Sequence, residues 1–169
     1  MVPVSEGIVQ PVVLDNTVLT NFALVDRADL VMHLWPTTVC TTPSVLDEYR
    51  SGVASGLVSA DAWADLAVLT MTEEETALAA RFSTRLGAGE RSCLAVAVRR
   101  RGLLASDDLD ARRTAQRQGV PLTGTIGILS LCVRRGYLSR EEANRLLAEM
   151  IALGYHSPFD NLDGLTEAS

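Results

Sequence analysis

The stretch VVLDNTVLTNF, residues 12–22, joins a short aliphatic run to a single carboxylate and then to a helical pattern. Val12 to Leu14 predicts a buried strand, because consecutive aliphatic residues suit a strand that is covered on both faces. Apolar residues at helical spacing then predict a helix over 17–27. Asp15 stands between the two. It suits a helix cap at a strand end, and it also suits the first ligand of a metal site.

The same alternation continues along the chain. Further strands are expected at 37–41, 66–69, 103–105 and 120–122, and further helices at 29–35, 43–54, 71–82, 90–101, 109–118, 126–135 and 140–153. Strands that alternate with helices imply right-handed crossovers and a mainly parallel sheet covered on both faces. The sequence therefore predicts an α/β fold, a three-layer α/β/α sandwich with about four to five strands. No linker divides it, so we expect one domain over 1–169, with its core at about 10–155 and a tail at 156–169.

The composition excludes several classes of protein. All fifteen basic residues are arginine, which excludes P-loop, Schiff-base and kinase mechanisms that need a lysine. Cys40, Cys93 and Cys132 are widely spaced in apolar runs, so they predict buried thiols without disulfides or a zinc site. No apolar run is long enough for a bilayer and no signal-like block opens the chain. A cytoplasmic protein without a membrane partner is therefore expected.

Charge is strongly segregated along the chain, although the net charge is −6. Residues 1–80 carry eleven acids and two arginines, 81–140 carry four acids and twelve arginines, and 141–169 carry six acids and one arginine. The basic middle segment leaves nucleic acid open as a partner in spite of the acidic total. Solvated helix faces paired with acids elsewhere explain the pattern equally well.

Acidic residues recur where parallel strands are expected to end. Asp15 follows the first strand, Glu48 lies in the helix after the second, Glu90 opens a helix after a glycine pair, and Asp107 and Asp108 follow a later strand. Each one suits a role as a helix cap, a first-turn acid or a partner of arginine. Carboxylates that converge in one cleft repel each other unless a cation neutralises them. An all-oxygen set of this kind suits Mg²⁺ or Mn²⁺.

Four motifs in this order resemble the PIN-domain family of metal-dependent ribonucleases, which includes the VapC-like toxins of bacterial toxin–antitoxin pairs. VVLDNTVLTNF (12–22) is similar to the family's opening hydrophobic-Asp-x-Ser/Thr-x-Leu motif, and TPSVLDEY (42–49) to its glutamate helix. GERSCLAVAVRRRGLLASDD (89–108) is similar to the third-acid helix and the strand after it. DDLDARRTAQRQGVPLTGTIGIL (107–129) resembles a subgroup with an Asp pair before Ala-Arg and a later Gly-Thr-x-Gly.

The resemblance implies a PIN-like fold and a set of site residues. The catalytic acids that it implies are Asp15, Glu48, Glu90 and Asp108. The metal ligands that it implies are Asp15, Glu90, Asp108 and Asp107, supported by Thr17, Asn16 and Asp110. The phosphate-binding residues would be Arg112, Arg113 and Arg117, on the helix after the Asp pair.

Two departures from the family pattern affect this assignment. Many related chains carry a second acid at the position of Ser92, and the common Asp-x-Asp-Phe ending is missing because Ala111 follows Asp110. The choice of Asp107, Asp108 or Asp110 as the fourth acid therefore stays open, as does full activity.

The activity that the resemblance implies is hydrolysis of an RNA phosphodiester by a metal-activated water, with no covalent enzyme intermediate. A cognate antitoxin is an implied partner, and the last two helices could receive it, pack a homodimer or simply bury their apolar faces. One alternative is a PIN-fold binding or regulatory module with weakened catalysis, which Ser92 would suit. The other is a Mg²⁺-binding phosphoacceptor signalling domain, which the lack of lysine disfavours.

Overall fold

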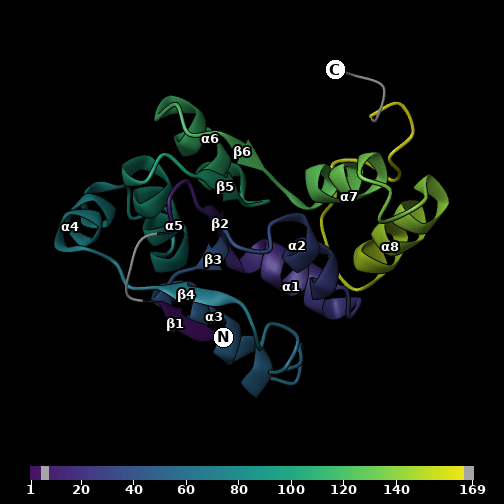
Figure 1. Cartoon of the computed structure of the whole chain (residues 1–169), viewed down its shortest axis with the longest axis horizontal. Coiled ribbons are helices and arrows are strands. Elements are labelled where there is room, and N and C mark those ends of the chain that lie inside the picture. Colours follow the sequence, from purple (N-terminus) through teal and green to yellow (C-terminus); the bar gives the residue numbers. More distant parts are fainter. Residues whose placement is uncertain (5–7, 166–169) are drawn as a thin grey trace.

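The computed structural model describes residues 1–4 and 8–165, which form six strands and eight helices (Figure 1). The strands are β1 (Val2–Val4), β2 (Val12–Leu14), β3 (Val39–Thr41), β4 (Ala67–Leu69), β5 (Leu103–Ala105) and β6 (Leu122–Thr123). The helices are α1 (Asn16–Leu24), α2 (Ala28–Leu34), α3 (Pro43–Ala54), α4 (Glu73–Arg81), α5 (Ala88–Arg99), α6 (Leu109–Arg117), α7 (Thr125–Arg134) and α8 (Arg140–Ala152).

The strands form one parallel sheet in the order β1-β4-β3-β2-β5-β6. The central strand β2 pairs with β3 on one side and with β5 on the other, where Val13 lies opposite Leu104. Val13 is fully buried and Leu104 is almost so, as expected for a strand covered on both faces. The predicted α/β class and parallel sheet are confirmed.

The sequence analysis missed strand β1, so the sheet has one strand more than the four to five expected. Its three residues contain Pro3, and Val2 donates its backbone N–H to the Leu66 carbonyl at 2.8 Å. β1 pairs only with β4 and lies at the edge of the sheet, where a proline costs no ladder hydrogen bond. A stretch this short has no side-chain pattern that would identify it, and its pairing with β4 defines it as a strand.

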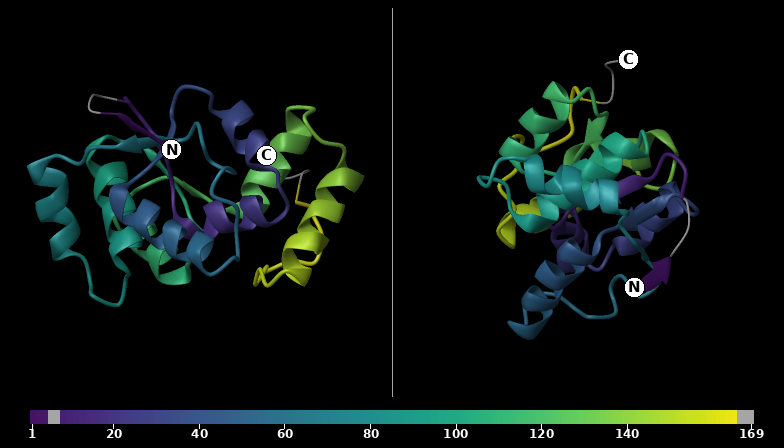
Figure 2. Two further views of the ribbon diagram at one scale, coloured as in Figure 1. Left: turned by 90° about the horizontal axis from the view of Figure 1, so that it is seen from below. Right: turned by 90° about the vertical axis from the view of Figure 1, so that its left-hand side faces the viewer.

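Two groups of helices cover the sheet. α5 packs against α3, α4 and α6, and α1 packs against α2, α3, α7 and α8, so that α3 contacts both groups. Figure 1 shows α4 and α5 on one side of the strands and α1 and α2 on the other, and the left view of Figure 2 shows α7 and α8 beyond them. Right-handed crossovers produce this division, because the chain moves one way across the sheet from β2 to β4 and the other way from β4 to β6.

Local signals in the sequence explain most helix boundaries. Thr42 caps α3 by accepting from the Val45 N–H, with Pro43 at the first helical position. Gly136 and Gly154 follow α7 and α8 with positive φ angles of 74° and 111°, as helix-ending glycines do.

Several boundaries differ from the expected ones by one to three residues, and for two of them a hydrogen bond gives the reason. α5 begins at Ala88, because the Glu90 carboxylate accepts from the Gly87 N–H and makes Gly87 the N-cap. β6 begins at Leu122, two residues later than expected. Val120 instead donates its N–H to the Ala115 carbonyl and closes α6.

The core extends past the expected boundary at residue 155. Leu162 is fully buried, and its N–H donates to the Asn144 side chain at 2.8 Å. All three cysteines are buried free thiols, as predicted. Among the described residues, no helix is both long enough and apolar enough to span a membrane.

Candidate functional site

The carboxyl ends of β2 and β5 lie side by side where the crossovers of the sheet diverge. From β2 the chain continues to β3 on one side, and from β5 it continues to β6 on the other. The position between the carboxyl ends of β2 and β5 is therefore a topological switch point, where sheets of this kind bind ligands. The Asp15 N–H donates to the Ala105 carbonyl at 2.9 Å and holds the two strand ends together.

Asp15 is a buried carboxylate at this switch point, with 2% of its surface exposed. Its Oδ2 accepts from the Ser106 hydroxyl at 2.7 Å and its Oδ1 from the Asn16 N–H, also at 2.7 Å. Burial raises the pKa of Asp15 to about 7; those two hydrogen bonds oppose the rise, and the negative charges of Glu90 and Glu48 add to it. Asp15 is thus the N-cap of α1. At the same time, the negative charges of two other acids destabilise its ionised form.

Glu48 reaches the site from α3. Its Oε1 accepts from the Gly89 N–H at 2.9 Å, in the first turn of α5. A Cβ atom at position 89 would lie 2.7 Å from both Glu48 carboxylate oxygens, so only glycine leaves room for this contact. Glu48 therefore lies against the N-terminus of α5, where the helix dipole favours a negative charge.

Glu90 is half-buried in the same turn. Burial raises its pKa, the hydrogen bond from Gly87 opposes the rise, and the negative charges of Asp108, Glu48 and Asp110 add to it. Glu90 is thus the capping-box acid of α5 and also a neighbour of the other carboxylates.

The Asp107, Asp108 and Asp110 side chains lie in three different environments. Asp108 caps α6, because its Oδ1 accepts from the Ala111 N–H at 2.8 Å. Asp110 is exposed and lies 3.6 Å from the Arg113 guanidinium. Asp107 accepts four hydrogen bonds from other parts of the chain. Asp108 interacts most strongly with Glu90. Its negative charge raises the pKa of Glu90 more than that of any other neighbouring acid does.

Thr17 and Asn16 flank Asp15 in different ways. The Thr17 hydroxyl lies 3.4 Å from Asp15 Oδ2 and accepts from the Asp107 N–H at 3.1 Å, so it links the ends of β2 and β5. Asn16 Oδ1 is buried and accepts no hydrogen bond among the described residues. A buried acceptor without a donor is uncommon in folded proteins, and here it lies beside the acidic site.

The three predicted phosphate-binding arginines have different environments. Arg112 donates to the Ser106 and Thr123 carbonyls, both at 2.9 Å, and so joins the ends of β5 and β6. Arg117 donates to the Thr114 hydroxyl at 3.1 Å. Arg113 is exposed beside Asp110. Arg112 is therefore occupied inside the fold, whereas Arg113 and Arg117 are exposed, and Arg113 lies beside Asp110.

Two serines of this region have roles that sequence reasoning did not identify, although Ser92 is itself one of the departures from the family pattern. The Ser106 hydroxyl donates to Asp15 and accepts from the Asp108 N–H at 3.2 Å, so it bridges these two residues. Ser92 is buried and hydrogen-bonds Thr42 at 2.6 Å and the Gly89 carbonyl at 2.7 Å, so it ties α3 to α5. A lone serine carries no sequence signal for either role, because both depend on partners far along the chain.

The donor set fits a hard divalent cation in its chemistry. The oxygens engaged in capping are Glu48 Oε1, Glu90 Oε2 and Asp108 Oδ1, and within the described part of the chain the other oxygen of each accepts no hydrogen bond. Mg²⁺ and Mn²⁺ prefer such carboxylate oxygens. As the side chains lie, the described residues contain no group of three His, Cys, Asp or Glu gathered closely enough to hold an ion. Binding therefore requires these side chains to rotate toward a common point.

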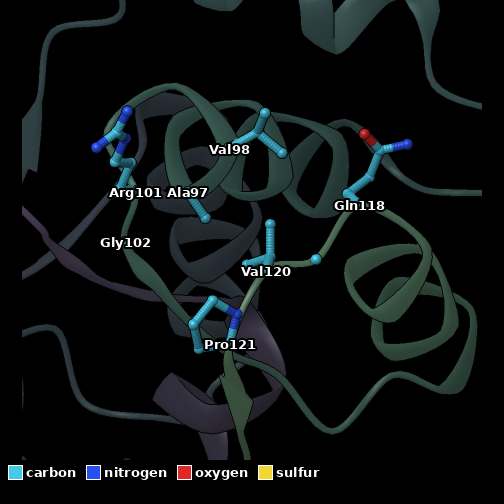
Figure 3. A pocket seen from close by; sticks show the side chains of 8 residues that line it. Ala97, Val98, Arg101, Gly102, Gln118, Val120 and Pro121 are labelled. Atoms are coloured by element: carbon cyan, nitrogen blue, oxygen red, sulfur yellow. The ribbon is translucent and has the colours of Figure 1, made fainter.

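A hollow at the opposite, N-terminal ends of the strands is separate from the acidic residues. It has a volume of about 210 Å³ and lies before β5 and β6, between Arg101, Gly102, Gln118 and Pro121 (Figure 3). Its lining contains no carboxylate, so it cannot supply the ligands of a hard cation. The acidic residues at the carboxyl ends of β2 and β5 form the candidate functional site.

Comparison with known families agrees with this geometry. A family profile described as a PIN domain matches residues 11–164. The chain belongs to the PIN-domain family. PIN domains are generally nucleases that use divalent metal ions, so membership supports a nuclease-type hydrolase. No curated protein and no solved structure matches the chain.

Proposed function

We propose that the protein is a Mg²⁺- or Mn²⁺-dependent endoribonuclease that hydrolyses RNA phosphodiester bonds. The observation that carries the proposal is that Asp15, Glu48, Glu90 and Asp108 lie around the carboxyl ends of β2 and β5, where Glu90 and Glu48 raise the pKa of Asp15, and Asp108 and Glu48 raise that of Glu90. Such mutual repulsion is relieved when a cation binds. The PIN-domain match supports the nuclease class.

In this proposal each side chain has a distinct task. Asp15, Glu90 and Asp108 hold the ion, and Glu48 adds negative charge from α3. Ser106 and Asn16 fix the Asp15 carboxylate, and the Thr17 hydroxyl orders water beside it. When bound, the ion supplies the positive charge that activates a water and stabilises the displacement at phosphorus. Arg113 binds a substrate phosphate next to the site.

The test is RNA cleavage by purified protein with Mn²⁺, with chelator, and after Asp15→Asn. Cleavage should need the metal and should fall by at least about 100-fold in the variant, because the buried ligand is lost. The matched control is Asp65→Asn. Asp65 is exposed and precedes β4, at the opposite end of the strands from the acidic site, so the substitution should leave cleavage unchanged. Metal-dependent cleavage that survives Asp15→Asn in full would refute the site.

A toxin role is the finer part of the proposal. We propose that a cognate antitoxin restrains the ribonuclease in a cytoplasmic toxin–antitoxin pair, in a single-domain protein that could also form a homodimer. Its test is expression in a bacterial host. The wild-type protein should arrest growth and the Asp15→Asn variant should not, whereas equal growth of both cultures would argue against toxicity.

The second candidate is a PIN-fold binding module with weakened catalysis. Buried Ser92 stands where many relatives have a further acid, and the carboxylates that are present are engaged in capping. Calorimetric titration with Mn²⁺ alongside the cleavage assay separates the two candidates. RNA binding without metal binding or cleavage would favour the module.

A further inference from the structure

We propose that Asp107 is a positioning residue and not a metal ligand, and that Tyr155, from the segment after α8, completes the cluster that holds it. The cluster comprises Asn21, Asp107, Thr125 and Tyr155. The proposal rests on the proposed function, since it says which elements hold the β5–α6 turn and its acid, Asp108, in place.

Both oxygens of the Asp107 carboxylate accept hydrogen bonds. Oδ1 accepts from the Thr125 N–H at 2.9 Å and from the Tyr155 hydroxyl at 3.2 Å. Oδ2 accepts from the Thr125 hydroxyl at 2.6 Å and from the Asn21 amide at 3.1 Å. A metal ion at either oxygen would have to displace these donors, which present hydrogens to the carboxylate. Asp107 is thus satisfied without a cation.

The donors themselves are buried and come from distant elements. Asn21, Thr125 and Tyr155 are 6%, 0% and 9% exposed, and they belong to α1, to the start of α7 and to the segment after α8. The Asn21 amide also donates to the Thr125 hydroxyl at 3.1 Å, which closes the network. Figure 1 shows the chain after α8 running back past α7. The C-terminal segment therefore contributes directly to a turn at the end of β5.

This turn carries two groups of the acidic site. Ser106, which donates to Asp15, precedes Asp107, and Asp108 follows it. The Asp107 N–H donates to the Thr17 hydroxyl and the Asp108 N–H to the Ser106 hydroxyl, at 3.1 and 3.2 Å. Because Asp107 lies between them, fixing its side chain fixes the position of both neighbours.

The first test compares Tyr155→Phe with Tyr137→Phe. Tyr137 is 46% exposed, and its ring contacts His33, away from the site. Tyr155→Phe removes only the hydroxyl, so Mn²⁺ affinity measured by calorimetry should fall by about 10-fold. The kcat for RNA cleavage should fall with KM unchanged. Tyr137→Phe should alter neither. A lowered Tm with normal kcat and Mn²⁺ affinity would show a merely structural role and overturn the proposal.

The second test exchanges donor and acceptor within the cluster. Asp107→Asn turns an amide NH₂ toward the Asn21 NH₂, so two donors oppose each other. Adding Asn21→Asp restores the match, because the new carboxylate at position 21 accepts from the new amide at position 107. The single variant should lose about 10-fold or more of Mn²⁺ affinity, and the double variant should recover most of it. If Asp107 ligates the metal, the double variant stays as weak as the single one.

A readout that needs no metal separates this proposal from the proposed function. Amide hydrogen exchange at Asp107 and Asp108 should be about 10-fold faster in Tyr155→Phe and Asp107→Asn than in wild type, and normal in the double variant. If wild-type protein neither binds Mn²⁺ nor cuts RNA, the ribonuclease proposal fails, and exchange still decides whether the cluster holds the turn. Unchanged exchange in both single variants would overturn the positioning role.

Discussion

At the scale of single residues, Asp15 combines two roles that the sequence presents as alternatives. It caps α1 and lies among other acids, and burial raises its pKa to about 7 from 3.8. Without divalent metal, the folded state therefore keeps a proton that the unfolded state has lost between pH 3.8 and 7. The free energy of unfolding should fall as the pH rises through this window, by up to about 4 kcal/mol, and level off above it.

Urea unfolding of chelator-treated protein from pH 4.5 to 8 measures this effect. Asp15→Asn carries no titrating carboxyl, so its unfolding free energy should lack the Asp15 contribution and exceed that of wild type at pH 8. The exposed control Asp65→Asn should follow the wild-type profile. A profile identical in wild type and Asp15→Asn would contradict the buried, proton-binding state of Asp15.

At the scale of elements, the site depends on the contact between α3 and α5. The Glu48 carboxylate lies so close to Gly89 that a methyl group there must displace it. We expect Gly89→Ala to lower RNA cleavage on the order of 100-fold, since small misplacements at a site cost that much. Stability should hold or rise by up to about 1 kcal/mol, because alanine favours the helix more than glycine does. Cleavage rates and urea unfolding measure the two effects.

Gly52→Ala is the matched control, because it lies within α3 and its added methyl group would only reach ordinary contact with Val58 at 3.4 Å. It should keep full cleavage. Full cleavage by Gly89→Ala as well would mean that Glu48 is dispensable.

At the scale of the whole molecule, the charge distribution should govern RNA binding. The protein carries a net charge of −6, yet its basic residues gather in the segment that includes α5 and α6. Binding to RNA phosphates releases counterions, so affinity should fall as salt rises. Arg113→Ala, at the exposed arginine beside the site, should reduce the slope of log affinity against log salt by about 0.7. Anisotropy of a labelled single-stranded RNA in chelator measures this slope without cleavage.

Arg99→Ala removes the same charge from the far end of α5, where Arg99 pairs with Glu74. Its slope should match wild type. Equal reductions in both variants would indicate that RNA responds to total charge and not to a contact beside the site.

The sequence by itself determined the order of the elements from β2 onward and the identity of the acids. Hydrophobic runs marked β2 and β5, Thr42 and Pro43 marked the start of α3, and Gly136 and Gly154 marked helix ends, because these signals act over a few residues. The acid motifs were found in the same way. They are local, and the PIN-domain match over residues 11–164 covers all of them.

Only the tertiary structure decided which strands are neighbours and which polar groups meet. β1 exists through its pairing with β4, and Asp107 is held by donors from α1, α7 and the segment after α8. Its partner Tyr155 lies 48 positions along the chain, a separation at which sequence carries no contact signal. Hydrogen bonds between distant segments form when packing brings them together. The sequence therefore named the acids, and the fold decided which of them lie around the carboxyl ends of β2 and β5 and which one is enclosed by hydrogen-bond donors.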